Sequence, residues 1–115
     1  MSFKITKANE SYTYTAPGHF DVRTTRLHDP KDVDGGKLIC GLSHFLPAGG
    51  VDKGSNPNES IYYIIEGEMT VTIDGNDTKL EKGDSIHLGP NTERSIKNTG
   101  IASAQMLVVI LPAQQ

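Results

Sequence analysis

The sequence predicts an all-β protein of antiparallel strands, arranged as a sandwich or a barrel. Apolar residues alternate with polar ones in most of the chain, and no window carries an apolar face at helical spacing. Turn-forming Gly, Pro, Asn and Asp residues recur every eight to twelve residues. At 115 residues, the chain has the length of a single domain.

The first half of the chain carries three predicted strands. Residues 11–15 alternate aromatic and hydroxyl side chains, and residues 20–27 are rich in β-branched side chains. A polar loop over 28–36 follows, because this stretch gathers Asp, Pro and Gly. Residues 37–46 then form a long apolar strand, which we expect Pro47-Ala48-Gly49-Gly50 to end.

The second half alternates short strands with tight turns. Strands over 61–65 and 69–73 flank Gly67, and Asp74-Gly75 is a strong hairpin signal. The remaining predicted strands, each reached through a turn, are 78–80, 85–88, 93–97 and 104–111.

Composition narrows the possible partners and the compartment. The net charge of −3 is spread along the chain without a Lys/Arg block, so we expect neither a nucleic-acid nor a membrane partner. The single cysteine, Cys40, excludes an internal disulfide and fits a reducing compartment. Neither a signal-peptide stretch nor an apolar run of about 20 residues is present, which favours a cytoplasmic location.

The N-terminal segment bears on assembly. Residues 3–6 can form a short extra strand, and docking that strand on a partner subunit would hide a sheet edge. We therefore expect a homodimer.

Two segments resemble the motifs of the cupin superfamily. Residues 47–68 contain E-S-I-Y-Y-I-I-E-G ahead of a second alternating strand and are similar to the first cupin motif. Residues 83–98, beginning G-D-S-I-H-L-G-P-N-T, are similar to the second. The resemblance implies one domain over 1–115, folded as a double-stranded β-helix, or jelly-roll barrel, with a small-molecule pocket inside.

The sequence departs from the family at its metal ligands. The family's first motif supplies two histidines and a glutamate; here the glutamate position maps to Ser60, and the histidine positions map to Lys53 and Ser55 or, in a shorter register, to Gly54 and Asn56. The histidine of the second motif maps to Arg94. Arg has no lone pair to donate to a metal and Lys is normally protonated, so we expect no metal and no other cofactor.

Arg94 is the strongest candidate for binding a ligand. At its motif position the resemblance points a side chain into the barrel, where a guanidinium requires an anionic partner. That partner would be the carboxylate or phosphate of a small ligand; the alternative is a salt bridge to Glu93 or Glu59. Four polar residues would form the wall of the cavity mouth: Lys53, Ser55, Asn56 and Ser60.

Three residues are candidates for handling protons. Tyr62 shares strand parity with Ser60 and should face the interior, either as a general acid or as a core aromatic. His44 lies on an apolar strand as a catalytic or a structural residue. Glu59 is one residue away from the ligand position, so it should face the other side of the sheet.

Three functions remain open at this point. The first is a metal-independent enzyme, of isomerase, lyase or decarboxylase type, that acts on a small carboxylate or sugar. The second is a non-catalytic binding or sensor module that needs only Arg94 and an apolar wall of Ile64, Ile96 and Leu42. The third is a cupin with an atypical metal site built from Glu59, His44 or His87.

Overall fold

The computed structural model describes residues 2–113 and consists almost entirely of strands. Two single-turn 3-10 helices, η1 (Ala8–Glu10) and η2 (Pro30–Asp32), lie near the N-terminus. The strands are β1 (Tyr12–Tyr14), β2 (His19–His28), β3 (Ile39–Gly54), β4 (Glu59–Glu66), β5 (Glu68–Ile73), β6 (Asn76–Glu81), β7 (Ser85–Leu88), β8 (Arg94–Asn98) and β9 (Ala104–Leu111). No helix in the described part of the chain is long and apolar enough to span a membrane.

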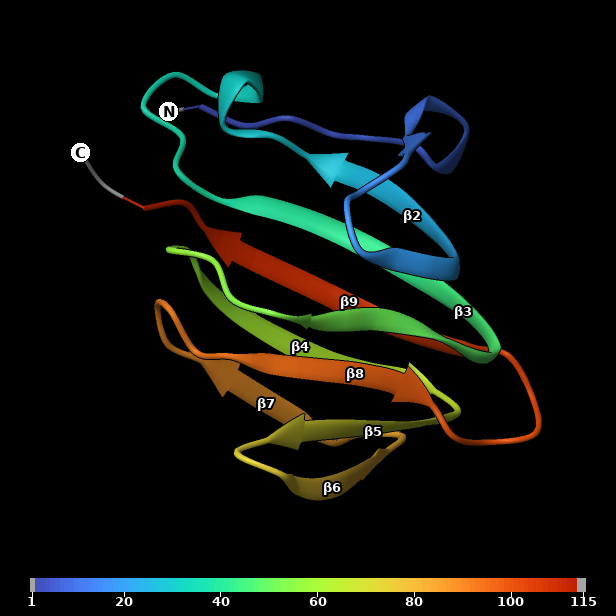
Figure 1. Cartoon of the computed structure of the whole chain (residues 1–115). Coiled ribbons are helices and arrows are strands. Elements are labelled where there is room, and N and C mark those ends of the chain that lie inside the picture. The colour runs from blue at the N-terminus through green and yellow to red at the C-terminus, as the bar shows by residue number, and fades with distance from the viewer. Residues whose placement is uncertain (1, 114–115) are drawn as a thin grey trace.

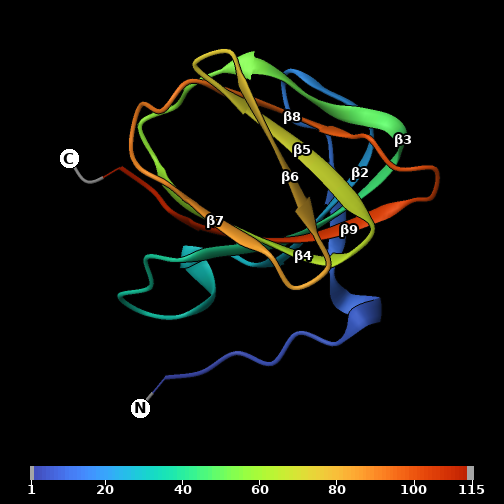
Figure 2. The same cartoon turned by 90° about the horizontal axis from the view of Figure 1, so that it is seen from below.

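All strand pairs are antiparallel and together they form one nearly closed barrel (Figure 1). The hydrogen-bonded path runs β6-β5-β8-β3-β9-β4-β7, with β2 added beside β3 and β1 beside β2. Figure 2 looks into the barrel and shows the strands curving around its interior. This is the predicted all-β jelly roll, and each predicted strand from 11–15 onward corresponds to an observed one.

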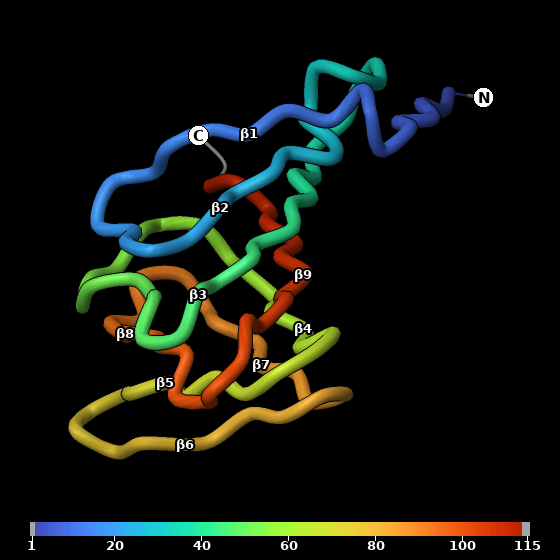
Figure 3. The backbone as a smooth tube through the Cα atoms, turned by 90° about the vertical axis from the view of Figure 1, so that its right-hand side faces the viewer, coloured from blue at the N-terminus to red at the C-terminus, as the bar shows by residue number. Residues whose placement is uncertain are grey.

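β3 differs from the prediction because it continues through Pro47-Ala48-Gly49-Gly50 to Gly54. Its first part pairs with β9, and its last part pairs with β8, so one bent strand joins both sides of the barrel (Figure 3). The bend requires close backbone contacts: a Cβ on Gly50 would lie 2.1 Å from the Ile96 carbonyl oxygen. The glycines that were expected to end the strand therefore allow it to pass between its neighbours.

The apolar core occupies one end of the barrel. Its buried members alternate along their strands, as a two-residue side-chain period requires. They are Phe45, Ile64, Met69, Val71, Leu80, Ile96, Ala104 and Met106. Asn98, only 1% exposed, connects the loops at this end, since its amide nitrogen donates to the Phe45 and Ala102 carbonyls.

Residues 3–6 do not pair with another strand within the described chain. They run as an extended arm, and the side chains of Phe3 and Ile5 are 76% and 66% exposed. The extra strand is thus absent from the single chain, and its docking on a partner subunit stays a prediction.

Candidate functional site

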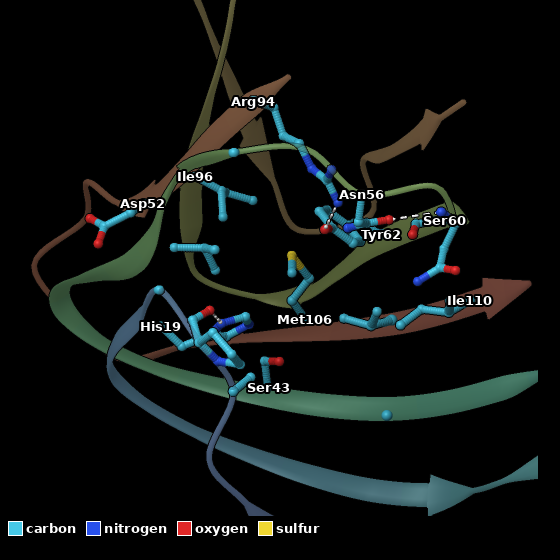
Figure 4. A pocket seen from close by; sticks show the side chains of 18 of the residues that line it. His19, Ser43, Asp52, Asn56, Ser60, Tyr62, Arg94, Ile96, Met106 and Ile110 are labelled. Carbon is cyan, nitrogen blue, oxygen red and sulfur yellow. Dashed lines mark hydrogen bonds between the residues drawn. The ribbon is translucent and has the colours of Figure 1, made fainter. Parts of the chain in front are cut away.

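A cavity of about 550 Å³ opens inside the barrel, and the core residues Phe45, Ile96 and Met106 form part of its lining. Its walls are the inward-facing residues of β2, β3, β4, β8 and β9, together with the chain segment that precedes β2. Close to its mouth lies the turn between β3 and β4, where the resemblance places the first motif. Figure 4 shows the labelled side chains converging on this space from several strands.

Arg94 and Tyr62 meet at one wall of the cavity. Arg94 begins β8, and its Nη2 donates to the Tyr62 hydroxyl oxygen at 3.1 Å (Figure 4). Its Nη1 donates to the Thr92 carbonyl oxygen at 3.2 Å, which fixes the plane of the guanidinium. Within residues 2–113, no acidic side chain forms an ion pair with Arg94. Its charge therefore faces the cavity without a protein counter-ion.

The local acids considered as partners for Arg94 are engaged elsewhere. Glu93 forms an ion pair with Lys53 at 3.3 Å on the surface. Glu59 contacts His87, with 2.5 Å between carboxylate oxygen and Nε2. The sequence alternative of a salt bridge from Arg94 to either glutamate is thus not what the structure contains.

The predicted mouth residues do line the cavity. Lys53 and Ser55 are exposed at its rim, whereas Ser60 is 4% exposed and lies deeper. The Asn56 carbonyl oxygen accepts from the Asn91 backbone amide at 2.8 Å, which connects the β3–β4 turn to the turn before β8. The two segments that resemble cupin motifs are joined at this point.

His44 and Glu59 are not brought to the cavity. Glu59 faces the outside of β4, as its parity predicts, and His44 faces the outside of β3. The His44 ring lines a separate crevice beneath the N-terminal arm, and its Nδ1 is buried without a hydrogen-bond partner. Neither side chain is therefore among the residues that line the cavity of Arg94.

The apolar wall also differs from the expected one. Ile96 lines the cavity, but Leu42 points to the same outer crevice as His44, and Ile64 is buried in the core. The apolar lining comes instead from β9, through Met106, Val108 and Ile110 (Figure 4).

Outside the motif-like segments, sequence reasoning missed four polar residues that line the cavity: Tyr14, His19, Arg26 and Ser43. All belong to β1, β2 or β3, outside the two motif-like segments. The sequence predicts which of these residues share a strand face. It does not predict which face of β2 covers the cavity, because that depends on the bend of β3.

Arg26 is held firmly in this wall. Its Nη1 donates to Asp29 Oδ1 at 2.8 Å, and its guanidinium carbon lies 4.5 Å from the centre of the Tyr14 ring. Burial of the guanidinium lowers the pKa of Arg26. The interactions with Tyr14 and Asp29 favour the charged form more strongly, so the pKa of Arg26 lies above its ordinary value. The hydrogen bond from the Tyr12 hydroxyl, and then that from Arg26, lowers the pKa of Asp29.

The metal that the resemblance implies does not fit these residues. Within residues 2–113, no group of three His, Cys, Asp or Glu side chains is positioned to hold an ion. The ligand positions carry Lys53, Ser55, Ser60 and Arg94, and a guanidinium there would repel a cation.

Comparison with known proteins agrees with this architecture. The chain is 35% identical over 107 residues to Beta-D-galactosidase Rv1717 of Mycobacterium tuberculosis, an alignment that covers 93% of this chain and 92% of the relative. Its fold matches a predicted oxalate decarboxylase of Thermotoga maritima with a TM-score of 0.78 and 20% identity, over 94% of this chain and 98% of the other. The polyketide cyclase RemF of Streptomyces resistomycificus gives a TM-score of 0.80 at 18% identity, over 95% and 79%.

The family model described as "Cupin domain" matches residues 41–110, which include both motif-like segments. With a barrel of the same topology and a relative that aligns over nearly its whole length, this chain belongs to the cupin domain family.

Proposed function

We propose that this protein is a metal-independent small-molecule enzyme that holds an acidic metabolite inside the barrel, with Arg94 as the anchor. The observation that carries the proposal is the guanidinium of Arg94, which faces the cavity with no acidic partner among the described residues. A charged group in such a place is costly unless a ligand supplies the opposite charge.

The hydrogen bonds of Arg94 support this role. Thr92 and Tyr62 each accept one bond from a different terminal nitrogen, and both are neutral acceptors. The guanidinium is thereby oriented while its charge stays uncompensated. Five donors in a planar fork match a carboxylate in two parallel bonds, so an organic acid fits this wall better than a neutral ligand.

Tyr62 is the proton-transfer group of the proposal. Because Arg94 donates to its oxygen, the Tyr62 proton must point away from Arg94, and Tyr62 lines the cavity, where a ligand can accept that proton. A phenol beside an anchored acid suits an isomerisation, an elimination or a decarboxylation that moves one proton.

Hydrolysis of a glycoside by two carboxylates has less support. Such chemistry places two Asp or Glu side chains on either side of the bond that is cleaved. Among the described residues that line the cavity, Asp52 at the rim is the single carboxylate. The name of the mycobacterial relative therefore suggests a sugar as ligand more readily than it suggests this mechanism.

A second candidate is a non-catalytic binding module. The positions of His44 and Glu59 outside the cavity favour a binding module, because two of the three side chains predicted to transfer protons do not line the cavity. Anchoring by Arg94 is common to both candidates, so it is the step to test first.

The test compares acids with neutral analogues of the same shape by calorimetry. One pair is D-galacturonate and D-galactose, and the other is 3-phenylpropionate and 3-phenylpropionamide. We expect at least one acid to bind about tenfold or more tightly than its neutral partner, since a hydrogen bond to a charged group contributes about 1.5–3 kcal/mol.

Arg94→Ala should remove this preference for the acid. Lys97→Ala is the matched control, because it deletes a cation from the same strand whose side chain is exposed and does not line the cavity. Wild-type protein that binds neither acid, or an Arg94→Ala variant that keeps the preference, would contradict the proposal.

A further inference from the structure

Arg26 gives the cavity a second polar end, far from Arg94. The residue belongs to β2, and its side chain lines the cavity. Asp29 accepts a hydrogen bond from Nη1, Nε is buried without a hydrogen-bond partner, and Nη2 forms no hydrogen bond within residues 2–113. A buried N–H donor without an acceptor costs about 1–3 kcal/mol, and native proteins rarely leave one in this state.

The strand register defines the distance between the two ends. Arg26 pairs with Gly41, Gly41 with Val108, and Val108 with Tyr62, so the four residues form one row across β2, β3, β9 and β4. Three strand spacings of about 4.8 Å separate Arg26 from Tyr62, or roughly 14 Å between backbones before the barrel curves. Side chains that reach inward from both ends leave a gap the size of a small ligand.

Gly41 keeps the Arg26 end accessible. An atom at the Cβ position of Gly41 would lie 3.0 Å from the Thr25 carbonyl oxygen and 4.0 Å from the Tyr14 hydroxyl, so a side chain here would fill the narrow space beside Arg26. Two residues along the same face, Ser43 is 7% exposed and lines the cavity, and its hydroxyl makes no hydrogen bond within residues 2–113. Three side chains thus offer hydrogen bonds at this end: Arg26, Tyr14 and Ser43.

The wall between the two ends is apolar. Val108 lies in the row itself, and Met106 and Ile110 follow it on either side along β9. A ligand that touches both ends must therefore cross an apolar surface. Many hydroxyl groups in the middle of the ligand would lose water there without finding partners.

The charge at the Arg26 end is already balanced. Asp29 forms an ion pair with Arg26, and the Tyr12 hydroxyl donates to the same carboxylate at 2.6 Å. A second carboxylate on the ligand would meet the negative charge of Asp29 as well as Arg26. A neutral oxygen, in a hydroxyl or carbonyl group, can accept a hydrogen bond from Nη2 without that repulsion.

We propose that the ligand is an acid with an apolar body and a neutral oxygen at its far end, which Arg26 and Ser43 bind while Arg94 holds the acid group. This rests on the proposed function, because it takes Arg94 as the anchor. It narrows the substrate class from any small acid to one that is polar at both ends and apolar between them.

Three acids that differ only at the far end provide the test, measured by calorimetry on the whole chain. They are 3-phenylpropionate, 3-(4-hydroxyphenyl)propionate and 3-(4-carboxyphenyl)propionate. We expect the hydroxylated acid to bind about tenfold more tightly than the unsubstituted one, because its hydroxyl oxygen accepts a hydrogen bond from a charged donor. The diacid should bind no more tightly than the hydroxylated acid.

Two variants assign that gain to its residues. Arg26→Lys keeps the charge beside Asp29 but removes the guanidinium and its Nη2 donor, and it should bring the affinity ratio of the hydroxylated to the unsubstituted acid close to one. Ser43→Ala, a smaller change that keeps the arginine network, should reduce the ratio about threefold. Arg23→Lys is the control: this exposed residue lies on the opposite face of β2 and should leave the ratio unchanged.

The ratio separates the two proposals. Both acids are measured on the same variant, so partial loss of folded protein affects them equally and the ratio stays interpretable. Arg94→Ala should weaken both acids and leave their ratio intact. Equal binding of the two acids by the wild type, or a gain that Arg26→Lys does not reduce, would overturn the two-ended cavity and leave the Arg94 anchor standing. Failure of every acid to bind would overturn the proposed function itself.

Discussion

At the scale of single residues, Tyr62 and Tyr63 show how strand parity divides chemistry from packing. Tyr62 faces the cavity and accepts a hydrogen bond from Arg94. Tyr63, its neighbour on β4, points to the opposite face and is 43% exposed. Two identical side chains, adjacent in sequence, therefore lie in different surroundings, one in the cavity and one on the outer surface. Removing each hydroxyl in turn can distinguish catalysis in the cavity from binding alone.

Tyr62→Phe should abolish proton transfer while preserving most of the binding. The probe is phenylpyruvate in D₂O, whose methylene protons exchange with solvent through the enol and are followed by NMR. We expect the wild type to accelerate exchange over buffer, and Tyr62→Phe to lose about 10²-fold or more of the acceleration, the usual contribution of a general acid or base.

Tyr63→Phe is the control for this experiment, because it removes a hydroxyl of the same kind from the outer face. It should exchange phenylpyruvate as fast as the wild type. A wild type that binds phenylpyruvate without accelerating exchange would speak for the binding module and against the enzyme.

At the scale of elements, β3 determines the shape of the cavity. Its first part, up to Phe45, pairs with β9, and its last part, from Gly50, pairs with β8. The strand bends in the segment between these two parts. The wall that carries Ser43 and the rim that carries Lys53 thus belong to one continuous strand. A change at its bend should disturb the barrel and the cavity together.

Gly50→Ala should lower the free energy of unfolding by about 1–3 kcal/mol, the usual cost of forcing extra atoms into a packed region. Its new Cβ would lie 2.1 Å from the Ile96 carbonyl oxygen, which is backbone and cannot rotate away. Gly54→Ala, on the same strand, is the control, because the nearest atom to its Cβ is 3.9 Å away. Denaturant unfolding of both variants measures the difference, and equal stability of the two would contradict the steric explanation.

Strand parity accounts for what the sequence could predict at this scale. Alternation placed Tyr62 and Ser60 on one face of β4 and Glu59 on the other, as the structure has them. The family resemblance located Arg94, but it covers only the two motif-like segments. Arg26 was missed since its importance depends on a pairing with Gly41, and such long-range register is not visible in a local pattern.

At the scale of the whole molecule, one face of the barrel is unusually apolar. Outward-facing residues of β3, β9 and β4 lie side by side there, because Leu42 pairs with Leu107, and Leu107 with Tyr63. Ile61, which pairs with Val109, is 46% exposed. Contiguous apolar surface of this kind is typical of protein–protein contacts. The homodimer expected from the sequence would cover this outer apolar face, which comprises Cys40, Leu42, Ile61, Tyr63, Leu107 and Val109.

We expect the wild type to have twice the mass of one chain in light scattering coupled to size-exclusion chromatography. Replacing both Ile61 and Tyr63 by Lys should yield monomers, because two ammonium groups in an apolar interface lose their hydration without gaining a partner. Ile101→Lys is the control: Ile101 is fully exposed and lies in the turn between β8 and β9, away from the outer apolar face. A wild type with the mass of one chain would contradict the predicted dimer. A double variant that remains dimeric would show that the second copy does not bind on this face.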